Sequence, residues 1–252
     1  MKLIIPRNIY SAIFALSLPD EMKESIMVES SSLIIRELKN GNADIGLIPS
    51  IDLLKHNDLF VSKKIGISFD GLLSNSYLHL IPETSTFSDV YLNGDVSLNE
   101  IVLTKIIFKE RFKSEVTIHL DSNPLEFGKK NYLIVGKDND SEENFDKGIS
   151  FSDLIAEIID RPYVNFVLVS PDKNKLKNFT EKMENWDKKI EDNLEDYLNN
   201  IDEREEVSEF IRLNFNSAYF EITENEMEGL NDLLKLPFYH GMIDEIVELK
   251  WI

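Results

Sequence analysis

The chain has 252 residues, of which 42% are hydrophobic and 29% are charged, and its formal net charge is −19. This composition is typical of a globular protein. The acidic balance argues against nucleic acid and anionic membrane surfaces as partners, because clusters of Lys and Arg bind both. The chain has no Cys and only four scattered His, which excludes disulfides and thiolate metal sites, so we expect no metal site.

The N-terminal segment predicts a cytoplasmic location. Met1–Leu18 is apolar overall, but Pro6, Arg7 and Asn8 interrupt the continuous apolar run that a signal peptide needs. No later stretch approaches the ~20 consecutive apolar residues of a transmembrane helix. We therefore expect a cytoplasmic protein without a membrane span.

The first part of the chain alternates short apolar runs with segments of helical spacing. This order predicts a parallel sheet covered by helices, and open sheets of this kind bind ligands at the carboxyl ends of their strands. Asn8–Ser11 and Pro49–Ser50 follow two of these strands, so we expect both at the mouth of a site. The predicted strands are Leu3–Ile5, Ser25–Glu29 and Ala43–Ile48, followed by a further two at Ile65–Phe69 and Ser74–Ile81. The predicted helices are Ile9–Leu18 and a segment ending at Leu38.

A second α/β block follows a polar stretch of the chain. We expect two lobes joined by two crossings, near Pro82–Ser88 and near Ser170–Lys175. The first lobe is then discontinuous, with residues 1–85 and 175–252, and the second lobe comprises residues 86–174. The elements predicted in the second block are the helices Ser97–Phe112 and Phe151–Ile159 and the strands Glu115–Leu120, Tyr132–Val135 and Tyr163–Val169.

The last third of the chain begins with an apolar stripe at spacings of three and four residues. The stripe predicts one long amphipathic helix from about Lys173 to Asn200, whose apolar face packs on the core. Further helices are expected at Glu203–Phe215 and Glu224–Leu236, with a short strand at Tyr219–Ile222 between them. The stripe consists of Leu176, Phe179, Met183, Trp186, Ile190, Leu194, Tyr197 and Ile201.

The sequence contains no nucleophile elbow, P-loop or dinucleotide-binding glycine motif. Small polar residues gather instead at the ends of predicted strands and the starts of predicted helices. Together with the backbone N–H groups of helix starts, such side chains hold carboxylates in clefts. Any one of them taken alone is better explained as an ordinary cap or turn. These residues are Asn8, Ser11, Ser50, Ser74, Asn75, Ser76, Ser97 and Asn99.

Five segments carry motifs that follow one another in a recognisable order. Leu38–Leu54 reads LKNGNADIGLIPSIDLL, and Ile65–Leu80 reads IGISFDGLLSNSYLHL. They resemble the G-x-x-D-x-x-L-I-P-S-I-E and I-x-S-x-G-x-V-x-S-V-x-L motifs of the chorismate dehydratase family of menaquinone biosynthesis (the futalosine pathway). The resemblance implies an α/β, two-lobed type II periplasmic-binding-protein-like fold with a ligand cleft between the lobes. The other similar segments are Tyr132–Asp138, Ser150–Val169 and Ser217–Leu236.

Several positions depart from the motifs of this family. Its first strand leads into a Gly and an L-N-x-x-P-L run whose Asn faces the substrate, and here Asn8 or Tyr10 is the nearest match. Its S-x-T-S helix start falls on Val96–Asn99, and its S-V pair falls on Asn75–Ser76. Asn165 replaces the second Phe of its P-F-V-F strand. Scaffold residues are retained while cleft residues are altered, which indicates a changed ligand or lost catalysis.

The resemblance implies a lyase that removes water from chorismate to give 3-[(1-carboxyvinyl)oxy]benzoate. No cofactor is needed, because aromatisation drives the reaction and the site has only to orient the substrate and move one proton. The alternative is a non-catalytic binding protein or sensor for a small carboxylate, because fold does not determine function. Dihydroxynaphthoate synthesis in the same pathway is a third, less favoured reading. The residues expected to contact the ligand are Asn8, Tyr10, Ser11, Ser50, Asn75, Ser76, Ser97 and Asn99, with no catalytic acid or base assigned.

Overall fold

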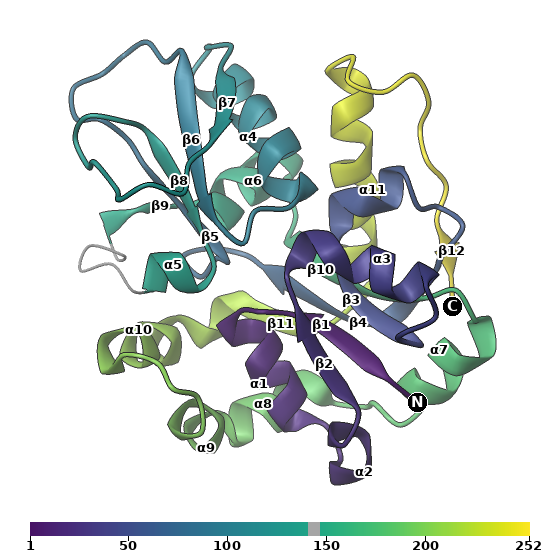
Figure 1. Ribbon diagram of the computed structural model, residues 1–252. Coiled ribbons are helices and arrows are strands. Elements are labelled where there is room, and N and C mark those ends of the chain that lie inside the picture. The colour runs from purple at the N-terminus through teal and green to yellow at the C-terminus, as the bar shows by residue number, and fades with distance from the viewer. Residues whose placement is uncertain (141–146) are drawn as a thin grey trace.

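The computed structural model describes residues 1–140 and 147–252 and has two α/β lobes, each built around its own sheet (Figure 1). The larger sheet, which defines the first lobe, contains strands from both ends of the chain. Its strands are, in spatial order, β11 (Ala218–Glu221), β4 (Phe60–Phe69), β10 (Tyr163–Ser170), β3 (Ile45–Pro49), β1 (Leu3–Pro6) and β2 (Ile26–Glu29), and β12 (Lys250–Trp251) lies beside β4.

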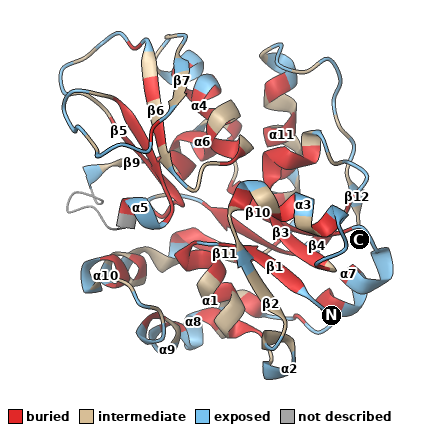
Figure 2. Cartoon of the chain, viewed as in Figure 1, coloured by how far each residue is buried: buried red, intermediate tan, exposed pale blue. Residues whose placement is uncertain are grey.

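The centre of the larger sheet is buried on both faces. Strand β1 is parallel to β2 and β3, as the N-terminal pattern predicts, whereas β10 is antiparallel to β3 and β4. Because side chains alternate along a strand, Leu3 and Ile5 pack in one apolar cluster and Ile4 packs in the other. Burial on both faces explains why these strands appear as continuous apolar runs. Figure 2 shows the buried strands at the centre of the first lobe.

Helices cover both faces of the larger sheet. On one face, α1 (Ile9–Ser17) packs against α8 (Trp186–Asp192) and α9 (Leu194–Asn199). On the other, α3 (Ile34–Lys39) contacts β3, and α11 (Glu224–Tyr239) contacts β10. The remaining helical elements of this lobe are α2 (Asp20–Lys23), α7 (Lys173–Thr180), α10 (Glu205–Asn214) and the 3-10 turns η1 (Ser31–Leu33), η2 (Ser50–Leu54) and η4 (Phe215–Ser217).

The smaller sheet defines the second lobe. Its strands β6 (Asp89–Gly94) and β8 (Tyr132–Val135) are parallel neighbours at the centre. Helix α11 of the first lobe contacts two helices of this lobe, so the lobes share apolar packing. The other elements are β7 (Thr117–Leu120) beside β6, β5 (Ser76–His79) beside β8, β9 (Ile149–Ser150) beside β5, and the helices α4 (Leu98–Arg111), α5 (Lys137–Asp140) and α6 (Phe151–Ile159).

Two strands belong to a different lobe from the one expected from the sequence. Ile65–Phe69 and Ser74–Ile81 both contain strands, as expected, but β4 belongs to the larger sheet and β5 to the smaller, outside the first lobe expected for both. Strand β10 was expected in the second lobe, but it lies in the larger sheet. The chain therefore passes between the sheets at residues 70–75 and 160–162. The first passage includes Gly71 at a φ of 132°, a conformation that L side chains rarely adopt. In the sequence, this glycine marks the passage between the lobes, and the amino-acid composition does not change there.

The predicted long helix from Lys173 to Asn200 is wrong as one element, because α7, α8 and α9 replace it. The chain turns before α8, where Asn185 adopts a left-handed φ of 53°, a conformation that Asn tolerates better than most residues. The apolar stripe is nevertheless buried as expected, because each short helix keeps its apolar face toward α1 and the sheet. Its buried members are Leu176, Phe179, Met183, Trp186, Ile190 and Leu194.

Candidate functional site

The eight residues predicted for the site are all buried, but they do not gather at one point. Two of them lie apart from the others. The ring of Tyr10 packs edge-on against Phe69 at a centroid distance of 4.7 Å, inside the first-lobe core. Ser76 lies within β5 opposite Val135. The other six form two groups, Asn8, Ser11 and Asn75 in one and Ser50, Ser97 and Asn99 in the other.

Unpaired polar atoms mark the start of α1. Asn8 caps this helix, since its Oδ1 accepts a hydrogen bond from the backbone N of Ser11 at 2.8 Å. The Nδ2 of Asn8 and the Oγ of Ser11 are buried and have no hydrogen-bond partner within the described residues. A buried polar group without a partner costs about 1–3 kcal/mol, so these two groups suit a ligand that completes their hydrogen bonds.

Asn75 approaches the same place from the segment that leads into β5. Its backbone oxygen accepts a hydrogen bond from the N of Gly136 at 2.7 Å. A Cβ at Gly136 would lie 3.8 Å from the backbone oxygen of Arg7 and 3.9 Å from Oδ1 of Asn75. That Oδ1 is also buried without a partner among the described residues. We call Asn8, Ser11 and Asn75 the α1 polar cluster.

A cavity of about 420 Å³ opens beside this cluster. Arg7 and Asn8 line it from the first lobe, and Lys137 lines it from the second. The Arg7 side chain makes no ion pair with any residue in the described ranges. Apolar side chains form most of the remaining wall, and Asp202 and Glu203 also line the cavity. The cavity thus combines an apolar body with hydrogen-bond donors at the α1 end. The apolar lining is Ile5, Ile9, Ala12, Ala15, Leu16, Ile26, Val28 and Ile201.

The second group is a hydrogen-bonded contact between the lobes. Asn99, at the start of α4, accepts from the backbone N of Ile51 at 2.8 Å and donates from Nδ2 to Oδ1 of Asn165 at 2.8 Å. The Oγ of Ser50 donates to the backbone oxygen of Val164, and the hydroxyl of Tyr163 donates to Oδ1 of Asn165 at 3.1 Å. The protein itself satisfies these side chains, so they hold α4 against β10. These hydrogen bonds explain why a polar residue, Asn165, occupies a position in the otherwise apolar strand β10.

Ser97 lies at the edge of the second group and caps α4. Its backbone N and its Oγ donate to Oε2 of Glu100 at 2.8 and 2.7 Å. Burial raises the pKa of Glu100, although these hydrogen bonds oppose the shift. Asp52 of η2 lies nearby, and burial first and the Glu100 charge second raise the pKa of Asp52 to about 7. The lobe interface therefore holds two carboxyl groups whose pKa values are raised.

A third contact between the lobes involves Asp95 and Ser31. Both carboxylate oxygens of Asp95 accept from the backbone N of Ser31 at 3.0 Å, and Oδ2 accepts from its Oγ at 2.7 Å. The donors that begin η1 are therefore occupied by a carboxylate from the second lobe. Asp95 was not predicted from the sequence, although it follows β6 at the carboxyl end, where the strand-end rule already placed Asn8 and Ser50.

We expect that replacing Asp95 by Ala will lower the free energy of unfolding by about 1–3 kcal/mol, because it removes charge-assisted hydrogen bonds across the lobes. Urea unfolding measures this change, and solution X-ray scattering should show a larger radius of gyration. Asp244→Asn, at an exposed position, is the control and should change neither value. Equal behaviour of the two variants would contradict a role for Asp95 in holding the lobes together.

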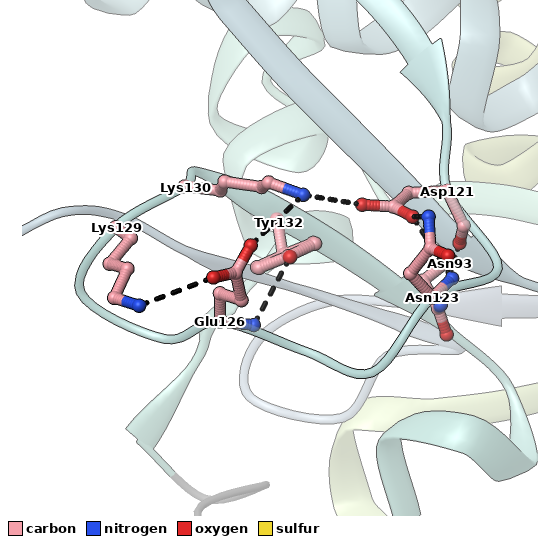
Figure 3. A network of polar contacts seen from close by, with 7 residues as sticks. All are labelled: Asn93, Asp121, Asn123, Glu126, Lys129, Lys130 and Tyr132. Carbon is pink, nitrogen blue, oxygen red and sulfur yellow. Dashed lines mark hydrogen bonds and ion pairs between the residues drawn. The ribbon is translucent and has the colours of Figure 1, made fainter.

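The cleft is acidic on the side of β6. A cavity of about 480 Å³ there is lined by Asp95, Asp121 and Asp138. Asp121 is neutralised, because its Oδ2 lies 3.1 Å from Nζ of Lys130 and its Oδ1 accepts from the backbone N of Asn123 at 3.0 Å (Figure 3). The lining of this cavity therefore includes three aspartates, of which Asp95 accepts hydrogen bonds from Ser31.

Comparisons with known proteins support the fold and leave the ligand open. The sequence matches no protein-family profile and no curated protein. The structure is similar to that of a protein of Archaeoglobus fulgidus, with a TM-score of 0.66 at 12% identity over 96% of this chain and 98% of that one. It is also similar to the ligand-binding component of an ABC-type import system from Staphylococcus aureus, with a TM-score of 0.59 at 10% identity over 99% and 96% of the two chains.

A further similar structure is the periplasmic aliphatic sulphonate-binding protein SsuA of Escherichia coli, with a TM-score of 0.56 at 10% identity over 99% of this chain and 90% of that one. The chain has the fold of the periplasmic binding proteins. Both the 420 Å³ cavity and the α1 polar cluster lie where its two lobes meet. Within the described residues of this periplasmic-binding-protein-like chain, no group of three or more metal-ligating side chains is found. No described helix has the length and apolar character to cross a bilayer.

The residues missed by sequence reasoning are Arg7, Ser31, Asp95, Gly136 and Lys137. Each of them follows a strand at its carboxyl end or begins the helical turn after it. The rule that selected Asn8 and Ser50 applies equally to these positions. Charged and glycine positions at strand ends thus shape the cleft as well as small polar residues, among which Ser31 meets the same rule.

Proposed function

We propose that the protein binds a small carboxylate between its lobes, at the α1 polar cluster. The observation that carries this proposal is the pair of buried, unpaired groups at the start of α1, Nδ2 of Asn8 and Oγ of Ser11. The helix start adds a partial positive charge, and Arg7 adds a full one. A carboxylate at this place accepts hydrogen bonds from these two unpaired groups and does not have to break a hydrogen bond within the protein. The sulphonate ligand in the name of the similar SsuA protein is also a small oxyanion.

The proposed ligand is chorismate, and the proposed reaction is its dehydration. The motifs from Leu38 to the C-terminus support this assignment through their resemblance to the chorismate dehydratase family. In the reaction, one ring carbon loses a proton and the neighbouring carbon loses its hydroxyl group, which together leave as water and make the ring aromatic. Asn8, Ser11 and Asn75 orient the substrate. None of these three side chains ionises, so none is assigned the transfer of the proton.

Incubation with chorismate tests binding and turnover together. We expect chorismate to raise the melting temperature in proportion to the logarithm of its concentration above the dissociation constant, and mass spectrometry to detect a product lighter by one water. Asn8→Ala and Ser11→Ala should each weaken binding about tenfold, because each removes a group that contacts the charged ligand. Ser208→Ala, a buried serine on α10, is the matched control and should bind normally. Unchanged affinity in all three variants would contradict the site.

A non-catalytic binding protein or sensor is the second candidate. Two observations favour it, namely the carboxylate of Asp95 on the donors of Ser31 and the closed hydrogen bonding of Ser50, Asn99 and Asn165. These groups are engaged by the protein and are not free for a substrate. Saturable binding of chorismate without release of water would support this candidate over the lyase.

A further inference from the structure

A separate cavity of about 590 Å³ opens between the lobes on the side of α3. Helix α3 and the end of η2 form its first-lobe wall, and the start of α4 forms its second-lobe wall. The first-lobe wall carries Arg36, Lys39, Lys55 and His56, and the acidic residue in the lining is Asp52. The net charge of the chain is −19, so a cavity wall with three cationic side chains has the opposite sign of charge from the protein as a whole. We call it the basic cavity.

Among the residues that the structure describes, neither lysine of the basic cavity forms an ion pair with a carboxylate, although the charge of Lys55 acts on Asp52. Nζ of Lys39 lies 2.9 Å from Nδ1 of His56, so the ammonium group donates to a neutral imidazole. Burial lowers the pKa of His56, and the charges of Lys39 and Lys55 add to this shift. Lys55 has neither an ion pair nor a hydrogen bond from its side chain within the ranges that the structure describes. Arg36 differs, because its Nε donates to Oε1 of Glu37 at 3.1 Å.

The second-lobe wall of the basic cavity is formed by the start of α4. Helix α4 has 14 residues and begins at this wall, with Ser97 as its N-cap. The start of this helix therefore faces the cavity, and Oε2 of Glu100, which accepts from the backbone N and the Oγ of Ser97, opposes the positive end of its dipole. Apolar side chains of Ile35 and Ile101 line the same cavity from opposite lobes. The basic cavity thus has a first-lobe wall with three cations for an anion and an apolar surface for a carbon framework.

We propose that the basic cavity binds a phosphate-bearing small molecule, with its oxyanion between Lys39, Lys55 and the start of α4. Two ammonium groups beside one imidazole match the several oxygens and the multiple charge of a phosphate group better than they match one carboxylate. The ligand contacts both lobes and so stabilises their closed arrangement. This proposal does not depend on the chorismate assignment, because no member of the α1 polar cluster lines this cavity.

Isothermal titration calorimetry with inorganic pyrophosphate tests the proposal on the full chain. We expect saturable binding to the parent protein and a loss of about tenfold or more in affinity in the double variant Lys39→Gln/Lys55→Gln. The control is Lys173→Gln/Lys188→Gln, which removes the same charge from exposed lysines elsewhere and should change the affinity less than about twofold. Absence of saturable binding to the parent, or equal losses in the two double variants, would overturn the proposal.

Asp52 provides a second and opposite test, because its carboxylate repels an anion in the same cavity. The titratable and charged groups around it are Glu100 from α4, Lys55 and His56 that follow η2, and Arg36 and Lys39 from α3. At pH 8 we expect Asp52→Asn to bind pyrophosphate about threefold more tightly than the parent, and at pH 6 the ratio of the two affinities should approach one. Pyrophosphate ionises equally in both measurements at a given pH, so its own ionisation cancels in the ratio of the variant affinity to the parent affinity. Equal ratios at both pH values would contradict an anion beside Asp52.

A parallel titration with ADP identifies the source of the phosphate. Tighter binding of ADP than of pyrophosphate, with the same loss in the Lys39→Gln/Lys55→Gln variant, indicates a phosphate ester whose carbon framework packs on Ile35 and Ile101. Tighter binding of pyrophosphate indicates a free polyphosphate. Chorismate affinity should be unchanged in this double variant, which separates the basic cavity from the site at α1.

Discussion

The Asp52→Asn variant is expected to be more stable than the parent protein at pH 8, by on the order of 2–4 kcal/mol in the free energy of unfolding. Burial and the neighbouring Glu100 raise the pKa of Asp52 from 3.8 to about 7 in the folded protein. The folded state therefore holds the Asp52 proton more tightly than the unfolded chain does. Its contribution to stability is fully present below pH 4 and is lost as the pH rises through about 7. An amide at this position has no such loss.

Urea unfolding of both proteins at pH 4 and pH 8 measures this effect. The difference between variant and parent should be larger at pH 8, because only the parent loses stability from this group over that interval. The control Asp244→Asn, at an exposed position of the C-terminal segment, should have the same free energy of unfolding as the parent protein at both pH values. A difference that does not change with pH would show that Asp52 has an ordinary pKa, and would remove the electrostatic link between η2 and α4.

The Trp186→Ala variant should lose about 3–5 kcal/mol of the free energy of unfolding. The side chain is 2% exposed and packs in the cluster between α1 and the larger sheet. Its Nε1 donates to Oγ of Ser17 at 2.9 Å, so the truncation also leaves that hydroxyl without its donor. The surrounding helices are fixed by the sheet and cannot collapse fully onto the space that the ring leaves.

Circular dichroism during urea unfolding follows this loss without relying on tryptophan fluorescence. Trp186→Phe should fall between the parent and Trp186→Ala, because it keeps a ring but removes the bond to Ser17. Leu213→Ala removes a side chain that is 73% exposed and should change stability by less than about 0.5 kcal/mol. A loss below about 1 kcal/mol for Trp186→Ala would mean that the stripe on α8 does not contribute to the core.

Local sequence signals were sufficient for most individual elements. The Asn8 cap, the apolar run of β1 and the Asn40-Gly41 pair after α3 each act within a few residues. Such signals depend on backbone conformation and on side-chain spacing, which are local properties. The burial of Trp186 and Ile190 also followed from spacing alone. The helix break at Asn185 could not be predicted from this spacing, because apolar residues continue at intervals of three and four residues across the break.

The grouping of the site residues could not be predicted in the same way. The strand-end rule selected Asn8, Ser50 and Asn99 as equivalents, but only Asn8 retains an unpaired group. Asn99 is satisfied by Ile51 and Asn165, which lie 48 and 66 residues away along the chain. Whether a polar side chain is free for a ligand or engaged by the protein depends on partners that the sequence does not place beside it.

By itself, then, the sequence determined the α/β class, the apolar faces of the strands and helices, and the polar character of the strand ends, because each of these depends on neighbours within a few residues. Only the tertiary structure decided that β10 joins the larger sheet, that Asp95 meets Ser31, and that Lys39 and Lys55 face α4. These are contacts between distant segments, and their stability comes from burying apolar surface and pairing buried polar groups throughout the fold.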